Sequence, residues 1–314
     1  MEIKTVAVSG TGMMGPGIAA VFALSGRDVT LVSRRRDTAQ AGVRKSRGLL
    51  SMLAENGLVR AHEAEAAANR IGPSDDPQEA VAGAQLFVES ILEDLPLKQQ
   101  YFQKLDEASP EAILCSNTSG ISITQIAAKC SRPQRVFTTH FWNPAHLMPL
   151  VEVVMGEKSD EAIAKRLMAL FRDCGKVPVL VRKDVPGQLG NRIQHAMIRE
   201  CMNIVAQGIA SAEDVDLAVK AGFGLRAPVY GVFEHADMVG LDLVKSVQDY
   251  VLPDLNTHPG ALPIHNQKIE AGELGVKSGK GFLDWPEGKA ERVRRRRDLF
   301  ILEFLKLQRA GRFD

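Results

Sequence analysis

The side chains of His140 and Glu152 are the pair in this sequence that is best suited to chemistry. His140 follows the β-branched run 136–139, and Glu152 lies inside a second such run, 150–154. Asn143-Pro144 between the runs is typical of a turn, so we expect two strands that set the imidazole beside the carboxylate. A carboxylate there fixes the ring's tautomer and stabilises the imidazolium, which predicts a positioned general base. Taken alone, a histidine at the end of a strand is more often a structural histidine than a base.

A glycine-rich turn near the N-terminus predicts a dinucleotide site. Gly10-Thr11-Gly12-Met13-Met14-Gly15 follows the buried-strand pattern 5–9 and leads into an apolar helix, 17–24. In such a turn Gly10 allows the tight bend, Gly12 lets the backbone approach a pyrophosphate, and Gly15 packs the helix against the strand. The helix N-terminus supplies free N–H groups and the positive end of its dipole. We expect NAD or NADP; FAD, or a glycine turn without a ligand, is the alternative.

The end of the second strand bears on which nicotinamide cofactor binds. NAD sites usually have an acidic residue there for the ribose hydroxyls, but this sequence has Ser33 followed by Arg34, Arg35 and Arg36. Without the carboxylate a 2′-phosphate is not repelled, and a guanidinium can pair with it. The sequence therefore favours NADP over NAD. The alternative is that the arginines are solvated and NAD is accepted through Ser33.

Alternating strand and helix patterns predict the fold class. Strands are expected at 5–9, 29–32, 86–88, 113–115, 136–140, 150–154 and 177–182, with helical stretches between most of them. This order is typical of a mostly parallel, doubly wound α/β sheet. After Lys183-Asp184-Val185-Pro186-Gly187 only helical patterns of comparable strength remain. We expect a dinucleotide-binding Rossmann domain, 1–184, followed by an all-α domain, 185–314.

Composition narrows the function classes. The 314 residues carry a net charge of +1, are 45% hydrophobic and contain no apolar run as long as a membrane span. Nucleic acid and membrane are therefore not expected as partners. The four cysteines are scattered without a Cys-x-x-Cys pair, which argues against a metal site and fits a reducing cytoplasm. The run Arg294–Arg297 is interpreted as a solvated helix face, with a phosphate contact as the alternative.

With these motifs in place, the chain resembles the L-3-hydroxyacyl-CoA dehydrogenase family over nearly its whole length. The resemblance is carried by the ordered motifs 10–15, Glu93-Asp94 with Lys98, Ser116–Ser119, His140–Pro144, Glu152, Asp184–Gly187 with Asn191-Arg192, and Lys277–Phe282. It implies a Rossmann domain, a helical domain that forms a homodimer, and a small-molecule substrate in the cleft between them.

The resemblance also implies roles for individual residues. His140 matches the catalytic base and Glu152 its orienting partner. Ser119 and Asn191 match residues that contact the substrate oxygen, and Asn143 matches an asparagine that supports the histidine. Glu93, Lys98 and Asn117 match the positions that line the nicotinamide-ribose end of the cofactor. Without the resemblance, Ser119 and Asn191 could be helix caps only.

Departures from the family pattern leave the substrate open. Besides Ser33, these are Gln188 after the Pro-Gly pair and Gly120 where a second serine is common. The leading prediction is reversible oxidation of a 3-hydroxyacyl-CoA. The alternative is a free hydroxy acid, as in relatives that resemble gulonate, carnitine or pyridine-carboxylate dehydrogenases; the stretches 191–194 and 222–226 look closer to these, and Arg226 could hold a carboxylate. The third hypothesis is a non-catalytic protein with a cofactor-binding or structural role.

Overall fold

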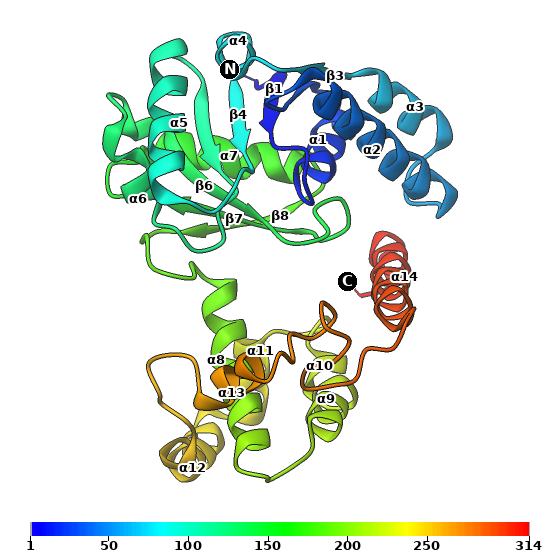
Figure 1. Cartoon of the computed structure of the whole chain (residues 1–314), viewed down its shortest axis with the longest axis vertical. Helices are drawn as coiled ribbons and strands as arrows, with labels where there is room; N and C mark the ends of the chain where they lie inside the picture. Colours follow the sequence, from blue (N-terminus) through cyan, green and yellow to red (C-terminus); the bar gives the residue numbers. More distant parts are fainter. Residues whose placement is uncertain (1, 314) are drawn as a thin grey trace. The chain divides into compact units, whose positions relative to one another are not determined.

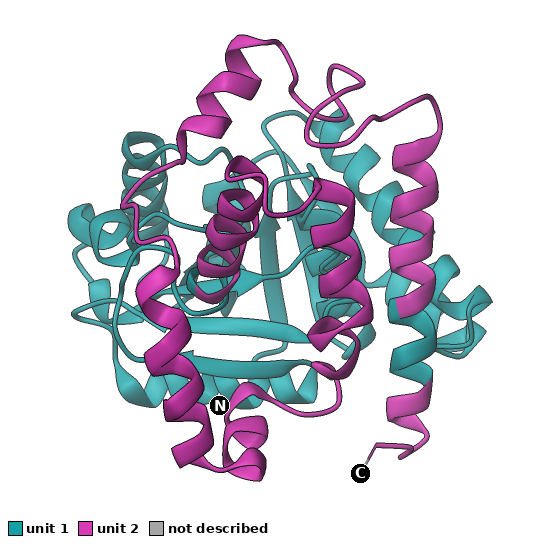
Figure 2. Cartoon of the chain, turned by 90° about the horizontal axis from the view of Figure 1, so that it is seen from below, with its two compact units in different colours: residues 1–192, 301–306 teal, residues 193–300, 307–314 magenta. Residues whose placement is uncertain are grey.

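The computed structural model describes residues 2–313. Its contacts divide the chain into two compact units, residues 1–192 with 301–306 and residues 193–300 with 307–314 (Figure 2). The division after Arg192 falls inside a helix, α8 (Gly190–Ala206), a few residues beyond the boundary at 184/185 that the sequence suggested. The return of 301–306 to the first unit was not anticipated.

The first unit is built on one sheet of eight strands in the order β3-β2-β1-β4-β5-β6-β7-β8. Every neighbouring pair is parallel except β6 and β7, which are antiparallel. The strands are β1 (Thr5–Ser9), β2 (Asp28–Val32), β3 (Ile71–Ser74), β4 (Leu86–Glu89), β5 (Ile113–Ser116), β6 (Val136–Phe141), β7 (Leu150–Met155) and β8 (Val177–Val181). The prediction of a mostly parallel sheet is confirmed, but the short edge strand β3 was missed.

Helices cover both faces of this sheet (Figure 1). One apolar core joins the strands to α1 (Gly15–Leu24), α2 (Arg36–Glu55), α3 (Ala61–Asn69) and α7 (Glu161–Asp173). A second core on the other face uses α4 (Pro77–Ala82), α5 (Leu95–Ala108), α6 (Ile123–Ile126) and η1 (Ala127–Lys129), while η2 (Pro133–Arg135) leads into β6. Parallel strands buried on both faces explain the nearly continuous apolar runs in the sequence. The doubly wound fold class is confirmed.

The second unit is helical. It contains most of α8, then α9 (Ala212–Ala221), α10 (Phe223–Arg226), α11 (Val232–Val239), α12 (Leu241–Val251), η3 (Leu252–Asp254), α13 (Pro263–Glu270) and most of α14 (Lys289–Arg309). The only β pairing described there consists of two isolated bridges, Gly275 with Lys280 and Lys280 with Asp284. The prediction of an all-α second domain is confirmed. None of the helices described for residues 2–313 is long and apolar enough to cross a membrane.

A short segment of α14, Ile301–Lys306, belongs to the first unit. Leu302 is 4% exposed and packs with Leu53, Leu58 and Leu147 in a small apolar cluster. The segment 301–306 is the teal portion of the otherwise magenta C-terminal helix in Figure 2. Leu147 follows the Asn143-Pro144 turn, so the cluster supports the loop between β6 and β7.

Candidate active site

The carboxyl ends of the parallel strands bring the predicted site residues to one edge of the sheet. The chain leaves β1 at Ser9, β4 at Glu89, β5 at Ser116 and β6 at Phe141, and these strands run parallel to one another. The strand order reverses between β1 and β4. Ligands of open α/β sheets bind in the crevice at such a switch point.

The glycine turn between β1 and α1 is closely packed at both ends and open in the middle. Gly10 has a φ of +108°, and a Cβ there would lie 2.1 Å from the carbonyl oxygen of Ser90. A Cβ on Gly15 would lie 1.7 Å from the carbonyl oxygen of Gly10, whereas a Cβ on Gly12 would meet nothing within 4 Å. Gly10 and Gly15 are therefore required by the fold. Gly12 leaves the backbone at the N-terminus of α1 accessible to a bound phosphate.

The arginines after β2 have different surroundings. Arg35 donates from Nε to Oδ1 of Asp37 at 2.9 Å, and Arg36 lies 3.7 Å from Asp75. The Ser33 hydroxyl is 2.6 Å from that of Thr38. Arg34 is exposed and forms no ion pair with a described residue, so its guanidinium is the one of the three that remains available.

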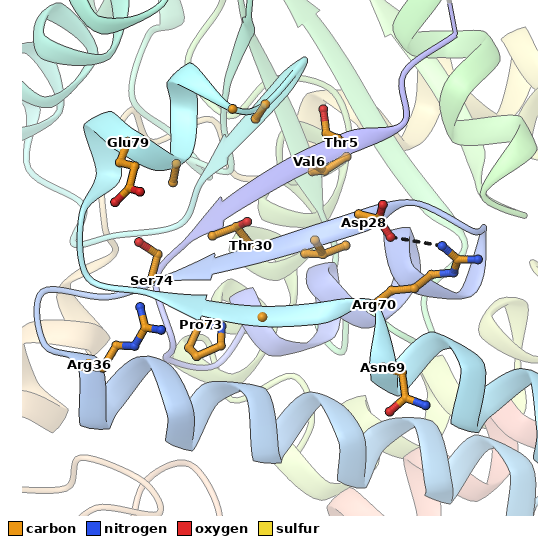
Figure 3. A pocket seen from close by; sticks show the side chains of 15 residues that line it. Thr5, Val6, Asp28, Thr30, Arg36, Asn69, Arg70, Pro73, Ser74 and Glu79 are labelled. Carbon is orange, nitrogen blue, oxygen red and sulfur yellow. Dashed lines mark hydrogen bonds and ion pairs between the residues drawn. The ribbon is translucent and has the colours of Figure 1, made fainter.

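A groove of about 550 Å³ lies over β1, β2 and β3. Arg36 lines one end of it, near Ser74, and the Asp28–Arg70 ion pair lies at the other (Figure 3). None of the residues predicted to be catalytic lines this groove. Its lining carries charges of both signs, so it is not a dedicated anion site.

A buried ion pair lies beneath the crevice. The carboxylate of Glu89, at the end of β4, accepts from Lys98 Nζ, Ser116 Oγ and the Ile91 N–H, each at 2.6 Å. Lys98 is 1% exposed and also lies 3.4 Å from Glu93. Glu93 accepts from the Thr118 hydroxyl and from the Ser119 N–H at 3.1 Å. Burial opposes ionisation of Glu93, but the hydrogen bond from Thr118 and the charge of Lys98 hold its pKa below the usual range.

Side-chain amides connect the loop after β5 to the segments around it. Asn117 accepts from the Phe141 N–H at 2.8 Å. Gln188 Nε2 donates to the Thr118 carbonyl, and Asn191 Nδ2 donates to the Ser119 carbonyl, both at 2.9 Å. The Ser119 hydroxyl itself is on an exposed residue. The structure thus brings Ser119 and Asn191 together.

His140 and Glu152 are directly opposite each other on the antiparallel strands β6 and β7. His140 Nδ1 is 2.7 Å from Glu152 Oε2, and the two residues are 6% and 0% exposed. Opposed residues on one face of an antiparallel pair have neighbouring side chains, which explains the contact. The other carboxylate oxygen, Oε1, accepts from the Leu189 and Gly190 N–H groups at 3.0 and 2.8 Å.

The carboxylate of Glu152 is held in its charged form. Burial alone would raise its pKa, but hydrogen bonds from His140, then Gly190, then Trp142 lower the pKa to about 2. An ionised carboxylate only accepts hydrogen bonds. His140 therefore carries its proton on Nδ1 when it is neutral, and Nε2 is left with a lone pair.

With this geometry established, comparison with known proteins identifies the family. The family model described as "3-hydroxyacyl-CoA dehydrogenase, NAD binding domain" matches residues 5–185, and "3-hydroxyacyl-CoA dehydrogenase, C-terminal domain" matches residues 187–285. Together these models span most of the sequence. The chain belongs to the 3-hydroxyacyl-CoA dehydrogenase family. It is an oxidoreductase of this type that uses NAD, and the predicted resemblance is confirmed.

Two relatives illustrate the range of the family. A 5-formyl-3-hydroxy-2-methylpyridine 4-carboxylate 5-dehydrogenase of Mesorhizobium japonicum is 36% identical over 93% of this chain and 96% of that protein. A probable 3-hydroxybutyryl-CoA dehydrogenase of Bacillus subtilis is 38% identical over 91% of this chain and 99% of that protein.

The solved structures similar to this chain also include a pyridine-carboxylate dehydrogenase and a hydroxyacyl-CoA dehydrogenase. A 5-formyl-3-hydroxy-2-methylpyridine 4-carboxylic acid 5-dehydrogenase, described as an NAD⁺-dependent dismutase, has a TM-score of 0.89 at 31% identity, over 98% of both chains. An (S)-3-hydroxybutyryl-CoA dehydrogenase of Ralstonia eutropha has a TM-score of 0.76 at 32% identity, over 91% of this chain and 100% of that one.

The residues present fit the NAD(H) that the family model implies. The accessible Gly12 backbone and the N-terminus of α1 suit a pyrophosphate, for the reason given above. Glu93 lies on the loop after β4, and Asn117 directly follows β5 at the same sheet edge. Lys98, by contrast, is buried, and its ammonium group contacts the carboxylates of Glu89 and Glu93.

Ser119 and Asn191 could each have capped a helix. The side chain that caps α6 is that of Ser122, which accepts from the Gln125 N–H, so Ser119 has no such role there. Asn191 is the second residue of α8, and its amide donates away from the helix to Ser119. Asn143 precedes a cis peptide bond to Pro144, and its side chain is exposed. Arg226 ends α10 and lies over the Tyr230 ring.

Sequence reasoning missed four residues of this region. Glu89 lies one residue beyond the strand predicted at 86–88 and was given no role, although a carboxylate directly after Leu86-Phe87-Val88 is a usable signal. Gln188 was noticed as a departure, but not its φ of +55° or its burial. Trp142 donates to Oε2 of Glu152 and Gly190 donates to Oε1, and no spacing in the sequence indicated these contacts.

Proposed function

We propose that this protein transfers hydride between NAD(P) and a hydroxyl-bearing carbon, with His140 as general base and Glu152 as its orienting partner. The observation that carries the proposal is the His140–Glu152 contact at 2.7 Å, between directly opposed residues at the edge of the sheet that the glycine turn shares. Bound NAD(P)⁺ supplies the hydride acceptor.

The side chains of the site handle the proton. In oxidation, Nε2 of His140 takes the hydroxyl proton, and Glu152 stabilises the imidazolium that forms. In reduction the imidazolium returns the proton to the new alkoxide oxygen. Asn191 uses one N–H of its amide on the Ser119 carbonyl, so its second N–H is left to donate to the substrate oxygen. The Ser119 hydroxyl is available to donate to the same oxygen.

For the substrate we propose a 3-hydroxyacyl-CoA, as the family match and the 3-hydroxybutyryl-CoA dehydrogenase relatives suggest. A free hydroxy acid is the second candidate, favoured by one observation. The pyridine-carboxylate relative superposes on this chain with a TM-score of 0.89, whereas the (S)-3-hydroxybutyryl-CoA dehydrogenase of Ralstonia eutropha gives 0.76.

We further propose that NADP(H) is accepted, with Arg34 as the phosphate-binding residue. Support comes from the absence of a carboxylate at Ser33 and from the pairing of Asp37 with Arg35, which neutralises the nearest acid. Replacing Arg34 by Gln should raise the KM for NADPH about tenfold and change that for NADH less than about twofold. Arg44→Gln, an exposed arginine on α2, is the control.

We propose a homodimer formed through the helical unit, in a reducing cytoplasm. Apolar side chains of α11 and α12 are widely exposed, among them Phe233 at 84% and Tyr250 at 87%, as expected of a buried interface. The cysteines are unpaired. Sedimentation should give twice the 34.2 kDa mass of one chain, and Phe233→Glu should give monomers.

The proposal is tested by following nicotinamide absorbance with acetoacetyl-CoA or free acetoacetate in the presence of NADH or NADPH, and with a hydroxymethylpyridine carboxylate in the presence of NAD⁺ or NADP⁺. Turnover of the CoA ester well above the free acids supports the first substrate, and the reverse supports the second. His140→Ala should lower kcat by about 10²–10⁴-fold, while His62→Ala, an exposed histidine on α3, should not change it. Retained activity in His140→Ala would refute the assignment of the base.

A further inference from the structure

Trp142, just past the end of β6, makes a second contact with the carboxylate that holds His140. Its indole Nε1 donates to Glu152 Oε2 at 3.0 Å, the same oxygen that is 2.7 Å from His140 Nδ1. The imidazole and indole ring centroids are 5.6 Å apart, with 54° between the ring planes. One carboxylate oxygen is thus shared by the histidine and the tryptophan.

The indole ring of Trp142 also packs against the backbone at Gly190. A Cβ on Gly190 would lie 2.4 Å from Cζ2 of Trp142, so the indole occupies the space where a side chain would be. The N–H groups of Gly190 and Leu189 donate to Oε1 of Glu152. Trp142 therefore contacts Oε2 directly and packs against the peptide that binds Oε1.

We propose that Trp142 is a positioning residue for the general base, whose N–H shares Glu152 Oε2 with His140 and whose ring fixes Gly190 at Oε1. The inference rests on the proposed function, in which His140 is the base. A glutamate carboxylate turns about its terminal torsion over a broad range when it is unrestrained. Four donors hold the two oxygens, two of them from residues 140 and 142 around the end of β6 and two from residues 189 and 190 where α8 begins, and together they prevent that rotation.

The shared oxygen has a consequence for the proton affinity of the pair. Of the four donors to Glu152, only His140 can carry a charge; the indole and the two peptide N–H groups are neutral dipoles. A donor on Oε2 draws part of the carboxylate's negative charge toward itself. When the indole N–H is removed, more of that charge faces His140, so the imidazolium is favoured and the neutral base is reached only at higher pH.

Trp142→Phe tests this by keeping an aromatic ring and removing the N–H. In the oxidation direction, the acid limb of the kcat/KM–pH profile should shift to higher pH by roughly half to one unit. At neutral pH kcat should fall about 3- to 30-fold, and the KM for the cofactor should change less than about twofold. The chain contains one other tryptophan, Trp285 in the second unit, so Trp285→Phe is the matched control and should follow wild type. A merely structural role would lower activity equally at all pH values, and an unmoved limb would overturn the inference.

The contact with Gly190 gives an independent test. Gly190→Ala should lower kcat at least about tenfold in the wild-type background, because the new Cβ must displace the indole or the peptide. In the Trp142→Phe background the loss should be several-fold smaller, because a phenyl ring does not extend as far as Cζ2. Equal losses in both backgrounds, which would mean additive effects, contradict the proposed packing role.

A spectroscopic measurement covers the case in which Trp142→Phe folds poorly. In the Trp285→Phe protein, Trp142 is the only indole, and an imidazolium quenches indole fluorescence at short range. The fluorescence of Trp142 should fall as the pH is lowered, and the midpoint of this transition should equal that of the acid limb of the activity profile. His140→Ala should abolish the fluorescence transition. If His140→Ala is inactive but the Trp285→Phe protein shows no fluorescence transition, the assignment of His140 as the base stands and the role of Trp142 is refuted. An active His140→Ala would instead refute the proposed function.

Discussion

At the scale of single residues, Glu152 links the proposed catalysis to acid stability. It is 0% exposed, and its pKa is lowered from 4.5 to about 2 by hydrogen bonds that outweigh burial. A carboxyl group with a depressed folded-state pKa stabilises the native state above its unfolded pKa, and this contribution is lost as the pH falls through the folded value. The stabilisation should therefore be complete above about pH 4.5 and disappear toward pH 2.

The prediction is checked by urea unfolding of wild type and Glu152→Gln from pH 7 to pH 2.5. The free energy of unfolding of wild type should fall over this range by more than that of the variant, with a difference on the order of 3 kcal/mol. Glu63 is a matched control, since its pKa is also lowered to about 2 but its side chain is 40% exposed, in an ion pair with Arg60. Glu63→Gln should follow wild type closely, because solvent screens such pairs. Parallel curves for wild type and Glu152→Gln would contradict the assigned hydrogen bonds.

The sequence predicted some contacts between residues of the candidate site and not others, and the difference has a physical reason. His140 and Glu152 could be paired because each lies in a β-branched run and a turn separates the runs, so strand periodicity sets their relation. Trp142 could not be connected to Gly190, because their contact depends on where the chain after β8 returns to the sheet. The positive φ of Gln188 was unpredictable for the same reason, since neighbouring residues do not require it.

At the scale of elements, the sequence predicted the buried strands well and the sheet edge poorly. β3 has the sequence Ile71-Gly72-Pro73-Ser74, and its glycine and proline both argue against a strand. It pairs only with β2 at the edge of the sheet, where the missing N–H of Pro73 does not interrupt a second ladder. The glycine turn was predicted at its observed place between β1 and α1, because the conformation of such a turn depends on its immediate neighbours.

That turn permits a comparison of two glycine variants. Gly15→Ala places a Cβ 1.7 Å from the Gly10 carbonyl oxygen, so β1 and α1 must separate, and the melting temperature should fall by several degrees, about 2 kcal/mol of stability. Gly12→Ala enters open space and should leave the melting temperature within about 1 °C. Cofactor binding, measured by NADH fluorescence, should weaken at least about tenfold in Gly12→Ala, because the methyl group keeps a phosphate from the backbone. Unchanged binding in Gly12→Ala would refute the location of the pyrophosphate.

At the scale of the whole molecule, the first unit is not complete without the far end of the chain. Residues 301–306 of α14 belong to it, although the family models end at residue 285. The sequence predicted α14 as a helix, but an arginine run and scattered apolar residues do not reveal which surface a helix meets. Leu302, 4% exposed among Leu53, Leu58 and Leu147, shows where it packs.

Leu302→Ala should therefore destabilise the first unit. Deleting a buried leucine side chain costs about 2–5 kcal/mol, part of it from the cavity that remains. Leu299, on the same helix and 45% exposed, is the matched control, and Leu299→Ala should cost less than about 0.5 kcal/mol. Because Leu147 belongs to the cluster and follows the Asn143-Pro144 turn, Leu302→Ala should also expose this loop to faster hydrogen exchange, while amides of β1 and β4 keep their protection until global unfolding. Equal stabilities of the two variants would mean that α14 does not pack on the first unit in solution, and the loop after His140 would then have to be held by the β6–β7 pairing alone.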